Sequence, residues 1–406
     1  MSMEERSNMR TVVKFGGSSV ADIEKMRHIA EILKARKAKG EDLVVVVSAM
    51  GKTTNQLLAI ANEAVTNPSK REVDMMISTG EQVSIALLSM ILNEMGAKAI
   101  SLTGFQAGIR TEGIHTKTKI LDIDIEKIEQ KLLEGNIVVV AGFQGYNDIG
   151  EITTLGRGGS DTTAVALAAK LNCVCEIYTD VDGIYGIDPR LYPKARHLDE
   201  IDFEEMKEMA FLGSKVMEPR SVDIAQHYGV QIYVASAHEN KRGTYIREVD
   251  RALESRSITG LSVAENVMMV TLNNLPVENI SEVFISLASE EINIDMISQT
   301  TMADGRTSLS FTASAEDKSA MEAIMHKIIS PIEGVTMSTV TDIVKISVVG
   351  SGMRTQSGVA AKLFKLFADH GIQFMQVTTS EISISYIMKK SYKEKAVFII
   401  AEDFQL

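Results

Sequence analysis

The chain has 406 residues, more than one ordinary domain needs and enough for two or three domains that each bury a core. Apolar residues make up 45% and charged residues 24% of the sequence, which excludes a disordered protein. The formal net charge of −12 is not offset by a basic patch, so a nucleic-acid or anionic-membrane surface is not expected. An anionic ligand therefore needs a locally built site.

The sequence also indicates a compartment. The cysteines, Cys173 and Cys175, are too close together for a structural disulfide and too few for a metal cage, which favours a reducing environment. The acidic N-terminal residues lack the apolar core of a signal peptide, and the apolar stretch at 75–92 is interrupted by Glu81 and Gln82. We expect a soluble, cytoplasmic protein without a membrane span.

The first part of the chain alternates short apolar runs with helical stretches, the order that gives a mainly parallel sheet sandwiched by helices. The expected strands and helices lie at residues 11–15, 21–37, 43–47, 54–66, 138–143, 160–171 and 176–179. We predict an α/β domain over residues 1–256.

The C-terminal part contains an internal repeat. A shift of 80 positions places residues 282–300 over residues 362–380 without a gap. The shift aligns three apolar pairs: Phe284 with Phe364, Ala288 with Ala368, and Ile292 with Ile372. Each copy reads strand, helix, strand, strand, the beginning of a ferredoxin-like βαββαβ unit. In the second copy these elements are expected at residues 344–349, 358–370, 372–378 and 382–388.

The second copy is one strand short, because residues 393–404 supply only one further element. Residues 257–265 are strand-like and precede the first copy's opening strand, so we predict that they complete the sheet of the second copy. The two units would then be interleaved. Residues 266–340 would form the first, and residues 257–265 plus 341–406 the second.

A glycine-rich loop follows the first expected strand and leads into a helix: Lys14-Phe15-Gly16-Gly17-Ser18-Ser19. Glycines let the backbone approach a phosphate, and the N–H groups at a helix start favour its charge. Two glycines also fit a plain turn, and the loop matches neither the Walker nor the dinucleotide pattern. The lysine at the strand end favours a phosphate cradle over the plain turn.

The most informative stretch is Thr153-Thr154-Leu155-Gly156-Arg157-Gly158-Gly159-Ser160-Asp161-Thr162-Thr163. Its glycines give a flexible backbone, its helix start favours an anion, and Arg157 offers a planar fork for a carboxylate. An ordinary helix cap needs one Ser or Asp and does not explain an arginine between glycines. We therefore expect an anionic substrate here.

Four segments together resemble the aspartokinases of the amino-acid kinase superfamily. They are Lys14-Phe15-Gly16-Gly17-Ser18-Ser19-Val20, Ser78-Thr79-Gly80-Glu81, Gly156-Arg157-Gly158-Gly159-Ser160-Asp161, and Tyr178-Thr179-Asp180-Val181-Asp182-Gly183-Ile184-Tyr185 with Asp188-Pro189-Arg190. The resemblance covers nearly the whole chain. The paired C-terminal units resemble ACT domains, and the absence of a fused dehydrogenase implies the monofunctional type.

The resemblance implies an ATP site with a nucleotide loop and Mg²⁺ that arrives with ATP. Lys14 and the backbone of Gly16, Gly17 and Ser18 would hold the phosphates, and Lys215 would be a second phosphate contact. The nucleotide loop would consist of Thr179, Asp180, Asp182, Gly183, Tyr185, Asp188 and Arg190. The histidines show no metal-ligand spacing, so no protein ligand of the metal is assigned.

The resemblance also implies an L-aspartate site. Arg157 would pair with the α-carboxylate and Glu81 with the amino group, while Asp161 would orient the transfer centre. Further substrate contacts would come from Ser48, Thr54, Gly158 and Ser160. An aspartate side chain with a pKa of about 3.9 is already ionised at neutral pH, so it needs no general base. Catalysis then rests on positioning and charge neutralisation, with Lys14, Arg157, Asp161 and Lys215 as the catalytic set.

A regulatory site is implied in the first repeat unit. Ile292-Asn293-Ile294-Asp295-Met296-Ile297-Ser298 is close to the effector segment of the family, and the carboxylate of Asp295 would pair with an effector's ammonium group. Asn279, Ile280, Asn293 and Gln299 would lie beside it. Lysine is the favoured effector and threonine the alternative. The second unit departs from this pattern at 372–380, which suggests a packing role, and we expect a homodimer or a dimer of dimers.

The expected protein is therefore a feedback-regulated kinase that forms 4-phospho-L-aspartate, the first step towards lysine, threonine and methionine. A relative acting on glutamate, acetylglutamate, carbamate or a nucleotide is disfavoured by the Gly156 to Asp161 segment and by the tandem units. An amino-acid-binding module with an inactive kinase domain is disfavoured because Lys14, Arg157, Asp161 and Lys215 are all present.

Overall fold

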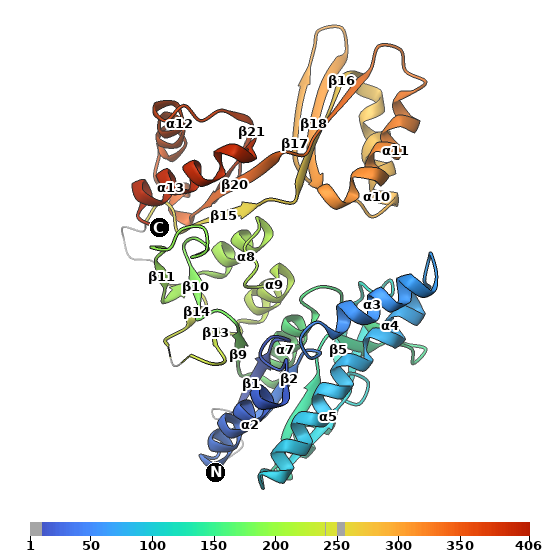
Figure 1. Ribbon diagram of the computed structural model, residues 1–406, viewed down its shortest axis with the longest axis vertical. Coiled ribbons are helices and arrows are strands. Elements are labelled where there is room, and N and C mark those ends of the chain that lie inside the picture. The colour runs from blue at the N-terminus through green and yellow to red at the C-terminus, as the bar shows by residue number, and fades with distance from the viewer. Residues whose placement is uncertain (1–9, 240, 250–255) are drawn as a thin grey trace. The chain divides into compact units, whose positions relative to one another are not determined.

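The computed structural model describes residues 10–239, 241–249 and 256–406, which form two compact units (Figure 1). The N-terminal residues 1–9 and residues 250–255, next to the domain boundary expected at 256, lie outside this description. The second unit contains Ala252–Leu406 and two short segments from the range expected for the first, Tyr185–Arg196 and Leu212–Ser214. The units are therefore not separated at one residue, and each is described by itself.

The first unit is built on an eight-stranded sheet with the order β12-β14-β13-β9-β1-β2-β6-β3. Its strands are β1 (Arg10–Phe15), β2 (Asp42–Val47), β3 (Ala99–Leu102), β6 (Ile137–Ala141), β9 (Val174–Thr179), β12 (Glu200–Ile201), β13 (Ile232–Ser236) and β14 (Thr244–Ile246). Only the β13–β14 pair among these is antiparallel. The mainly parallel sheet predicted from the apolar runs is confirmed.

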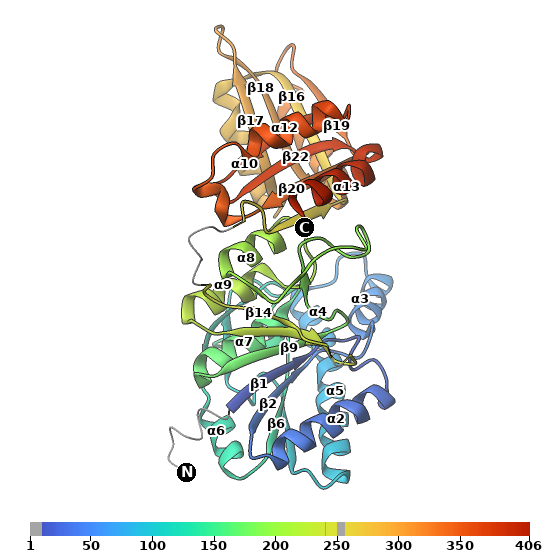
Figure 2. The same ribbon diagram turned by 90° about the vertical axis from the view of Figure 1, so that its left-hand side faces the viewer.

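Helices cover both faces of this sheet (Figure 2). Alternate side chains of β1, β2 and β6 form one core with α2 (Ile23–Ala38) and α5 (Thr79–Glu94). The helix α7 (Gly159–Leu171) packs on β1, β2 and β9, and the strand alternation places it on the opposite face. The remaining helices of the unit are α3 (Thr53–Ala64), α4 (Lys70–Ile77), α6 (Glu126–Leu133), α8 (Phe203–Phe211) and α9 (Pro219–Tyr228).

A small sheet that the apolar pattern did not predict lies beside the large one. It has the order β5-β4-β7-β8 and consists of β4 (Ile109–Glu112), β5 (Lys119–Ile123), β7 (Gln144–Tyr146) and β8 (Ile152–Thr154). These strands have three to five residues, too few to give a clear alternation in the sequence. A further two-stranded sheet pairs β10 (Ile184–Tyr185) with β11 (His197–Leu198).

The helices α4 and α5 follow each other in the stretch Lys70–Glu94. In the described part of the chain, this stretch alone has the length and apolar composition of a membrane span. However, 56% of its apolar window is buried within the fold, where α5 packs on α2, β3 and β6. Leu88 and Leu92 of α5 are fully buried. The stretch therefore acts as a core helix of the sheet domain.

The second unit contains two four-stranded antiparallel sheets, each with two helices. The first has the order β17-β18-β16-β19 and comprises β16 (Val267–Pro276), β17 (Ile294–Thr301), β18 (Arg306–Ser314), β19 (Thr336–Val340), α10 (Ile280–Ser289) and α11 (Lys318–Ile329). The second has the order β15-β20-β22-β21 and comprises β15 (Gly260–Ala264), β20 (Ile343–Val349), β21 (Phe374–Thr379), β22 (Ser383–Lys389), α12 (Val359–Asp369) and α13 (Lys393–Phe404). Short 3₁₀ turns precede the helices: η1 (Val277–Asn279), η2 (Ala315–Asp317), η3 (Ser351–Arg354) and η4 (Lys390–Tyr392).

The strand β15 precedes the first sheet in the chain but pairs with β20 of the second, so the two sheets are interleaved as predicted. The repeat is also visible in the packing. Ile292 and Ile372, which the 80-residue shift aligns, are 6% and 5% exposed in their respective cores. Leu287 of α10 and Phe367 of α12 are buried at equivalent positions.

A shared apolar contact and a buried ion pair join the two sheets of the second unit. Val267 and Met296 from the first sheet pack with Ile343 and Ile387 from the second. Beside them, the ammonium group of Lys345 on β20 pairs with the carboxylate of Asp295 on β17. The residue Lys345 is 4% exposed, so its charge depends on this partner.

Removing only the carboxylate should destabilise the second unit. Asp295→Ala leaves the Lys345 ammonium buried without its partner, and we expect the free energy of unfolding to fall by roughly 2–3 kcal/mol. Urea titration followed by circular dichroism measures the change. The matched control is Asp295→Leu combined with Lys345→Met, which removes both charges and should recover most of the loss. A single variant as stable as the wild type would contradict a stabilising role for the pair.

Candidate active site

The candidate site lies at the edge of the large sheet where the parallel strands β1, β2 and β6 end. At this edge three backbone hydrogen bonds join the ends of the four neighbouring strands β9, β1, β2 and β6. Gly16 N–H donates to the Tyr178 carbonyl over 3.1 Å, Ser48 N–H donates to Phe15 over 3.2 Å, and Gly142 N–H donates to Val47 over 3.1 Å. Ligands of open α/β sheets bind at such carboxyl ends.

The loop after β1 needs a glycine because a second loop approaches it closely. A Cβ atom on Gly17 would lie 2.9 Å from the Ala49 carbonyl oxygen and 3.1 Å from that of Gly51. Gly51 N–H in turn donates to the Gly17 carbonyl over 2.9 Å. Gly17 therefore lets the turn pack against the loop after β2, and Ser18 at its tip is exposed.

Lys14 and Asp161, both expected in the site, form an ion pair. Their side-chain N and O atoms are 2.5 Å apart, and the two residues are only 7% and 9% exposed. Lys14 comes from β1, while Asp161 lies in the first turn of α7, where the helix dipole favours a negative charge. The pair therefore places an ammonium group at the sheet edge next to a helix N-terminus.

Two expected hydroxyl residues meet at the same edge. The Ser48 and Ser160 hydroxyl oxygens are 2.8 Å apart, which joins the loop after β2 to the start of α7. Thr54 lies in the first turn of α3 and is partly exposed.

Glu81 provides a second buried carboxylate beside this group. Its Oε1 accepts a hydrogen bond from Ala49 N–H over 3.1 Å, and its Oε2 is buried without a hydrogen-bond partner among the described residues. Burial raises the pKa of Glu81 to about 7, and the backbone hydrogen bonds lower it only partly. An incoming ammonium group would stabilise the ionised form of this carboxylate.

The glycine-rich segment before α7 carries Arg157 at an exposed position. Gly158, the N-cap of α7, has a left-handed backbone (φ 64°), and a Cβ atom there would fall 2.5 Å from the Glu218 side chain. Burial raises the pKa of Glu218; Asp161 adds to this shift, whereas Arg220 and Arg157 oppose it. Arg157 therefore adds positive charge near the start of α7.

The other expected nucleotide residues lie at the end of β9, in the segment that follows it, and between α8 and α9. Asp180 is exposed and accepts a hydrogen bond from the Thr179 hydroxyl, and Asp182 pairs with Lys241 at 3.1 Å, beside the buried Gly183. Lys215 is exposed between α8 and α9. Three members fall in the second compact unit: Tyr185, Asp188 and Arg190. There Asp188 and Arg190 pair with each other at 2.7 Å.

The expected effector residues lie in and next to the first sheet of the second unit. Asp295 is held by Lys345, so an effector's ammonium group would compete with that side chain. Asn279 donates to Glu282 over 3.3 Å, and Gln299 donates to Thr301 over 3.0 Å. Ile280 begins α10, and Asn293 is exposed just before β17.

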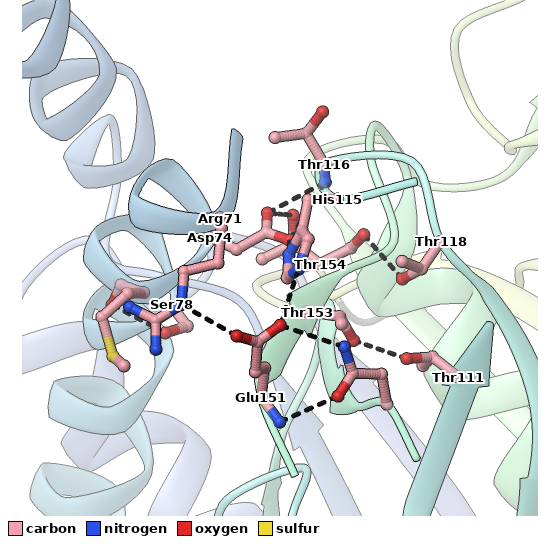
Figure 3. Close-up of polar contacts among 12 residues, drawn as sticks. Arg71, Asp74, Ser78, Thr111, His115, Thr116, Thr118, Glu151, Thr153 and Thr154 are labelled. Carbon is pink, nitrogen blue, oxygen red and sulfur yellow. Dashed lines mark hydrogen bonds and ion pairs between the residues drawn. The ribbon is translucent and has the colours of Figure 1, made fainter. Parts of the chain in front are cut away.

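Sequence reasoning missed several residues around the glycine-rich segment. Asp74, His115 and Glu151 form a polar cluster with Thr154 (Figure 3), and Arg220 donates to the Leu155 carbonyl over 3.4 Å. The available signal was Asp74, an acid within an apolar helical stretch seven residues before Glu81. It needed the fold to show what it contacts.

The sequence from residue 9 to 236 matches the amino acid kinase family, and residues 346–404 match the ACT domain. The chain therefore belongs to the amino acid kinase family. It is 46% identical over 398 residues to an aspartokinase of Geobacillus stearothermophilus, a match covering 97% of both chains. Aspartokinase 2 of Bacillus subtilis (strain 168) is 44% identical over the same shares.

A solved structure agrees with the fold. The crystal structure of E. coli aspartokinase III in complex with aspartate and ADP superposes with a TM-score of 0.81 at 24% identity, over 98% of this chain and 100% of that one. The sequence relatives place the chain within the aspartokinases, so the resemblance carried by the four segments is confirmed.

The raised pKa of Glu81 predicts a pH-dependent stability. The folded state holds a proton on Glu81 up to about pH 7, whereas the unfolded chain releases it near its ordinary pKa of 4.5. The folded state therefore binds more protons between these values, and stability falls as the pH rises through them. Relative to Glu81→Gln, the wild type should lose at most about 3 kcal/mol of unfolding free energy between pH 4.5 and 8.

Urea titrations of both proteins at several pH values measure this difference. Glu63→Gln, which removes an exposed carboxylate from α3, is the charge-matched control and should track the wild type. Equal pH dependence in all three proteins would show that Glu81 has an ordinary pKa.

Proposed function

We propose that the chain transfers the γ-phosphoryl group of ATP to the side-chain carboxylate of L-aspartate, giving 4-phospho-L-aspartate. The observation that carries the proposal is the buried Lys14–Asp161 ion pair at the sheet edge, next to the close-packed Gly16-Gly17 turn and the start of α7. Such a site offers cations and N–H groups to phosphoryl oxygens. Family membership supports the same reaction.

Charge neutralisation is the main task in this reaction, because two anions must approach each other. The aspartate carboxylate is ionised at neutral pH and attacks the γ-phosphorus directly, so no residue has to remove a proton. The ammonium of Lys14 lowers the repulsion as charge spreads over the phosphoryl oxygens. Asp161 holds that ammonium in place, and Lys215 is proposed as the second cation.

The two charged groups on the α-carbon of the aspartate substrate are assigned to different elements. The Arg157 guanidinium would bind the α-carboxylate as a planar fork, and the buried Oε2 of Glu81 would accept from the α-ammonium. Ser48, Ser160, Thr54 and the Gly158 backbone would complete the polar contacts. The 2.8 Å contact between Ser48 and Ser160 supports this grouping.

ATP would bind through Lys14 and the backbone of Gly16, Gly17 and Ser18. The nucleotide-loop assignment rests on the resemblance alone: Thr179, Asp180, Asp182, Gly183, Tyr185, Asp188 and Arg190. No group of three His, Cys, Asp or Glu residues within the described ranges forms a metal cage. We propose that ATP phosphates mainly hold the Mg²⁺ and that Asp161 is the nearby protein carboxylate. The bound ion would neutralise phosphoryl charge.

Feedback regulation by an amino acid is proposed for the second unit. The carboxylate of Asp295 already accepts an alkyl ammonium group, that of Lys345, which supports lysine as the favoured effector and leaves threonine as the alternative. Asn279, Ile280, Asn293 and Gln299 are the proposed neighbours. An effector can shift activity only if it binds one arrangement of the chain better than another.

The enzyme would act in the cytoplasm, which the two free cysteines support, and would begin the route to lysine, threonine and methionine. It would work as a homodimer or a dimer of dimers. We propose residues 1–256 as catalytic domain, 266–340 as first regulatory unit, and 257–265 plus 341–406 as second.

The direct test is Mg²⁺- and ATP-dependent phosphorylation of L-aspartate, trapped as the hydroxamate, with and without lysine or threonine. We expect turnover that lysine suppresses. Turnover that neither amino acid alters would overturn the effector assignment. Turnover of glutamate, acetylglutamate or carbamate in place of aspartate would overturn the assignment of aspartate as the substrate.

A substitution tests the central cation. Lys14→Ala removes the ammonium that faces the phosphoryl oxygens, and we expect kcat to fall on the order of 10²-fold or more. The matched control is Lys34→Ala, which removes an exposed lysine from α2 and should retain wild-type kcat. Near-normal turnover in Lys14→Ala would remove Lys14 from the catalytic set.

A further inference from the structure

A completely buried carboxylate lies outside the proposed substrate contacts. Asp74 on α4 has no exposed surface and accepts hydrogen bonds from two other segments (Figure 3). The Thr116 N–H donates to both of its oxygens over 3.1 and 3.0 Å, and the Thr154 hydroxyl donates over 2.5 Å. His115 Nδ1 lies 2.7 Å from Asp74 Oδ2. Three separate parts of the chain therefore meet at this one acid.

The cluster continues from His115 towards the surface. His115 Nε2 lies 3.3 Å from Glu151, and Arg71 Nε donates to the other oxygen of Glu151 over 3.3 Å. Asn147 donates to Glu151 over 3.3 Å as well. Each ring nitrogen of His115 thus faces a carboxylate, which leaves neither one to activate a hydroxyl nucleophile. The cluster is built to hold segments together.

The segments that Asp74 joins are those that carry Glu81 and Arg157, the two side chains proposed to bind the α-carbon groups of the substrate. Asp74 lies seven residues before Glu81, and α4 leads directly into α5, on which Glu81 lies. Thr154 is the last residue of β8, three residues before Arg157. The Gln144 side chain adds a second tie, donating to the Ser78 carbonyl over 2.8 Å.

The loop at Thr116 also supports the glycine-rich segment directly. The Thr116 carbonyl oxygen would lie 3.2 Å from a Cβ atom on Gly156. Thr118 donates from its backbone N–H and its hydroxyl to the Thr154 carbonyl, over 3.0 and 2.9 Å. Arg220 donates to the carbonyls of Thr118 and Leu155. The backbone before Arg157 is therefore held against this loop.

We propose that Asp74 is a positioning residue for the amino-acid substrate: through Thr154 and Thr116 it fixes the segment bearing Arg157 relative to the helix bearing Glu81. This proposal rests on the aspartate kinase function proposed above. Glu81 and Arg157 would bind the two charged groups on one carbon atom of the substrate, so a change in their separation weakens both contacts together. The Gly16-Gly17 turn, which is assigned to ATP, has no contact with Asp74 in the structure.

The expected size of the change in aspartate binding follows from how far the binding groups can shift. A shift of about 1 Å in a binding group can cost up to about 10²-fold in rate. Removing only the Thr154 hydroxyl leaves the other donors to Asp74 in place, so a smaller effect, on the order of tenfold, is expected in KM for aspartate.

The test uses a pair of matched variants in the full-length protein. Thr154→Val removes the hydroxyl that donates to Asp74 and keeps the shape of the side chain. Thr111→Val, in the adjacent β4, removes an equally buried hydroxyl that bonds to Thr153 and Tyr146 and does not touch Asp74. We expect Thr154→Val to raise KM for aspartate on the order of tenfold and KM for ATP less than twofold. Thr111→Val should change neither.

Two further measurements separate positioning from general destabilisation. Thr154→Ser restores a hydroxyl and should recover most of the lost aspartate affinity. Hydrogen exchange of peptides covering residues 155–161 should be faster in Thr154→Val than in Thr111→Val when each variant is measured equally far below its own melting temperature. Equal changes in KM for aspartate and ATP, or equal exchange in the two valine variants, would overturn the proposal.

The exchange measurement does not depend on turnover. If the wild type fails to phosphorylate aspartate, the proposed function is wrong, while the exchange comparison still decides whether Asp74 holds the segment before α7.

Discussion

The ion pair between Lys14 and Asp161 is the interaction on which the site depends. Two charges on residues that are only 7% and 9% exposed carry a desolvation cost of several kcal/mol per ion, and each charge compensates for the other. The pair can exist because β1 ends beside β2, and because α7 begins over that edge. Its position makes an ammonium group available where phosphate would meet the glycine turn.

Around this pair, the proposed site separates the task of holding phosphate from the task of holding an amino acid. The phosphate side is built from backbone, with Gly17 packed so closely on the next loop that no side chain fits. The amino-acid side is built from side chains on different elements, Glu81 on α5 and Arg157 before α7. Backbone contacts are fixed by the sheet, whereas side chains on separate elements need a brace, and the buried cluster at Asp74 provides one.

Much of this could be predicted from the sequence because it depends on local pattern. The valine-rich β2, the 80-residue repeat and the interleaved β15 follow from apolar periodicity and from counting strands. Lys14, Ser160 and Asp161 stand in motifs that are continuous in the chain. The Asp74 cluster could not be predicted, because His115 lies 41 positions from Asp74 in a loop and Thr154 lies 80 positions away at the end of a strand of three residues. The ion pair of Lys345 could not be predicted for a different reason. Lys345 lies within the fully buried β20, and no neighbouring residue in the sequence indicates which acid pairs with it.

The interleaving of the two regulatory sheets also constrains how the chain reaches its native state. β15 emerges from the ribosome before the whole first sheet, yet its partner β20 is made only afterwards, with Gly260 finally lying opposite Val349. Until β20 is made, β15 lacks its partner strand in this sheet, and the first sheet is an insertion between the two. A nascent chain that stalls before β20 would present this strand to other copies, so speed of completion protects the polypeptide from aggregation.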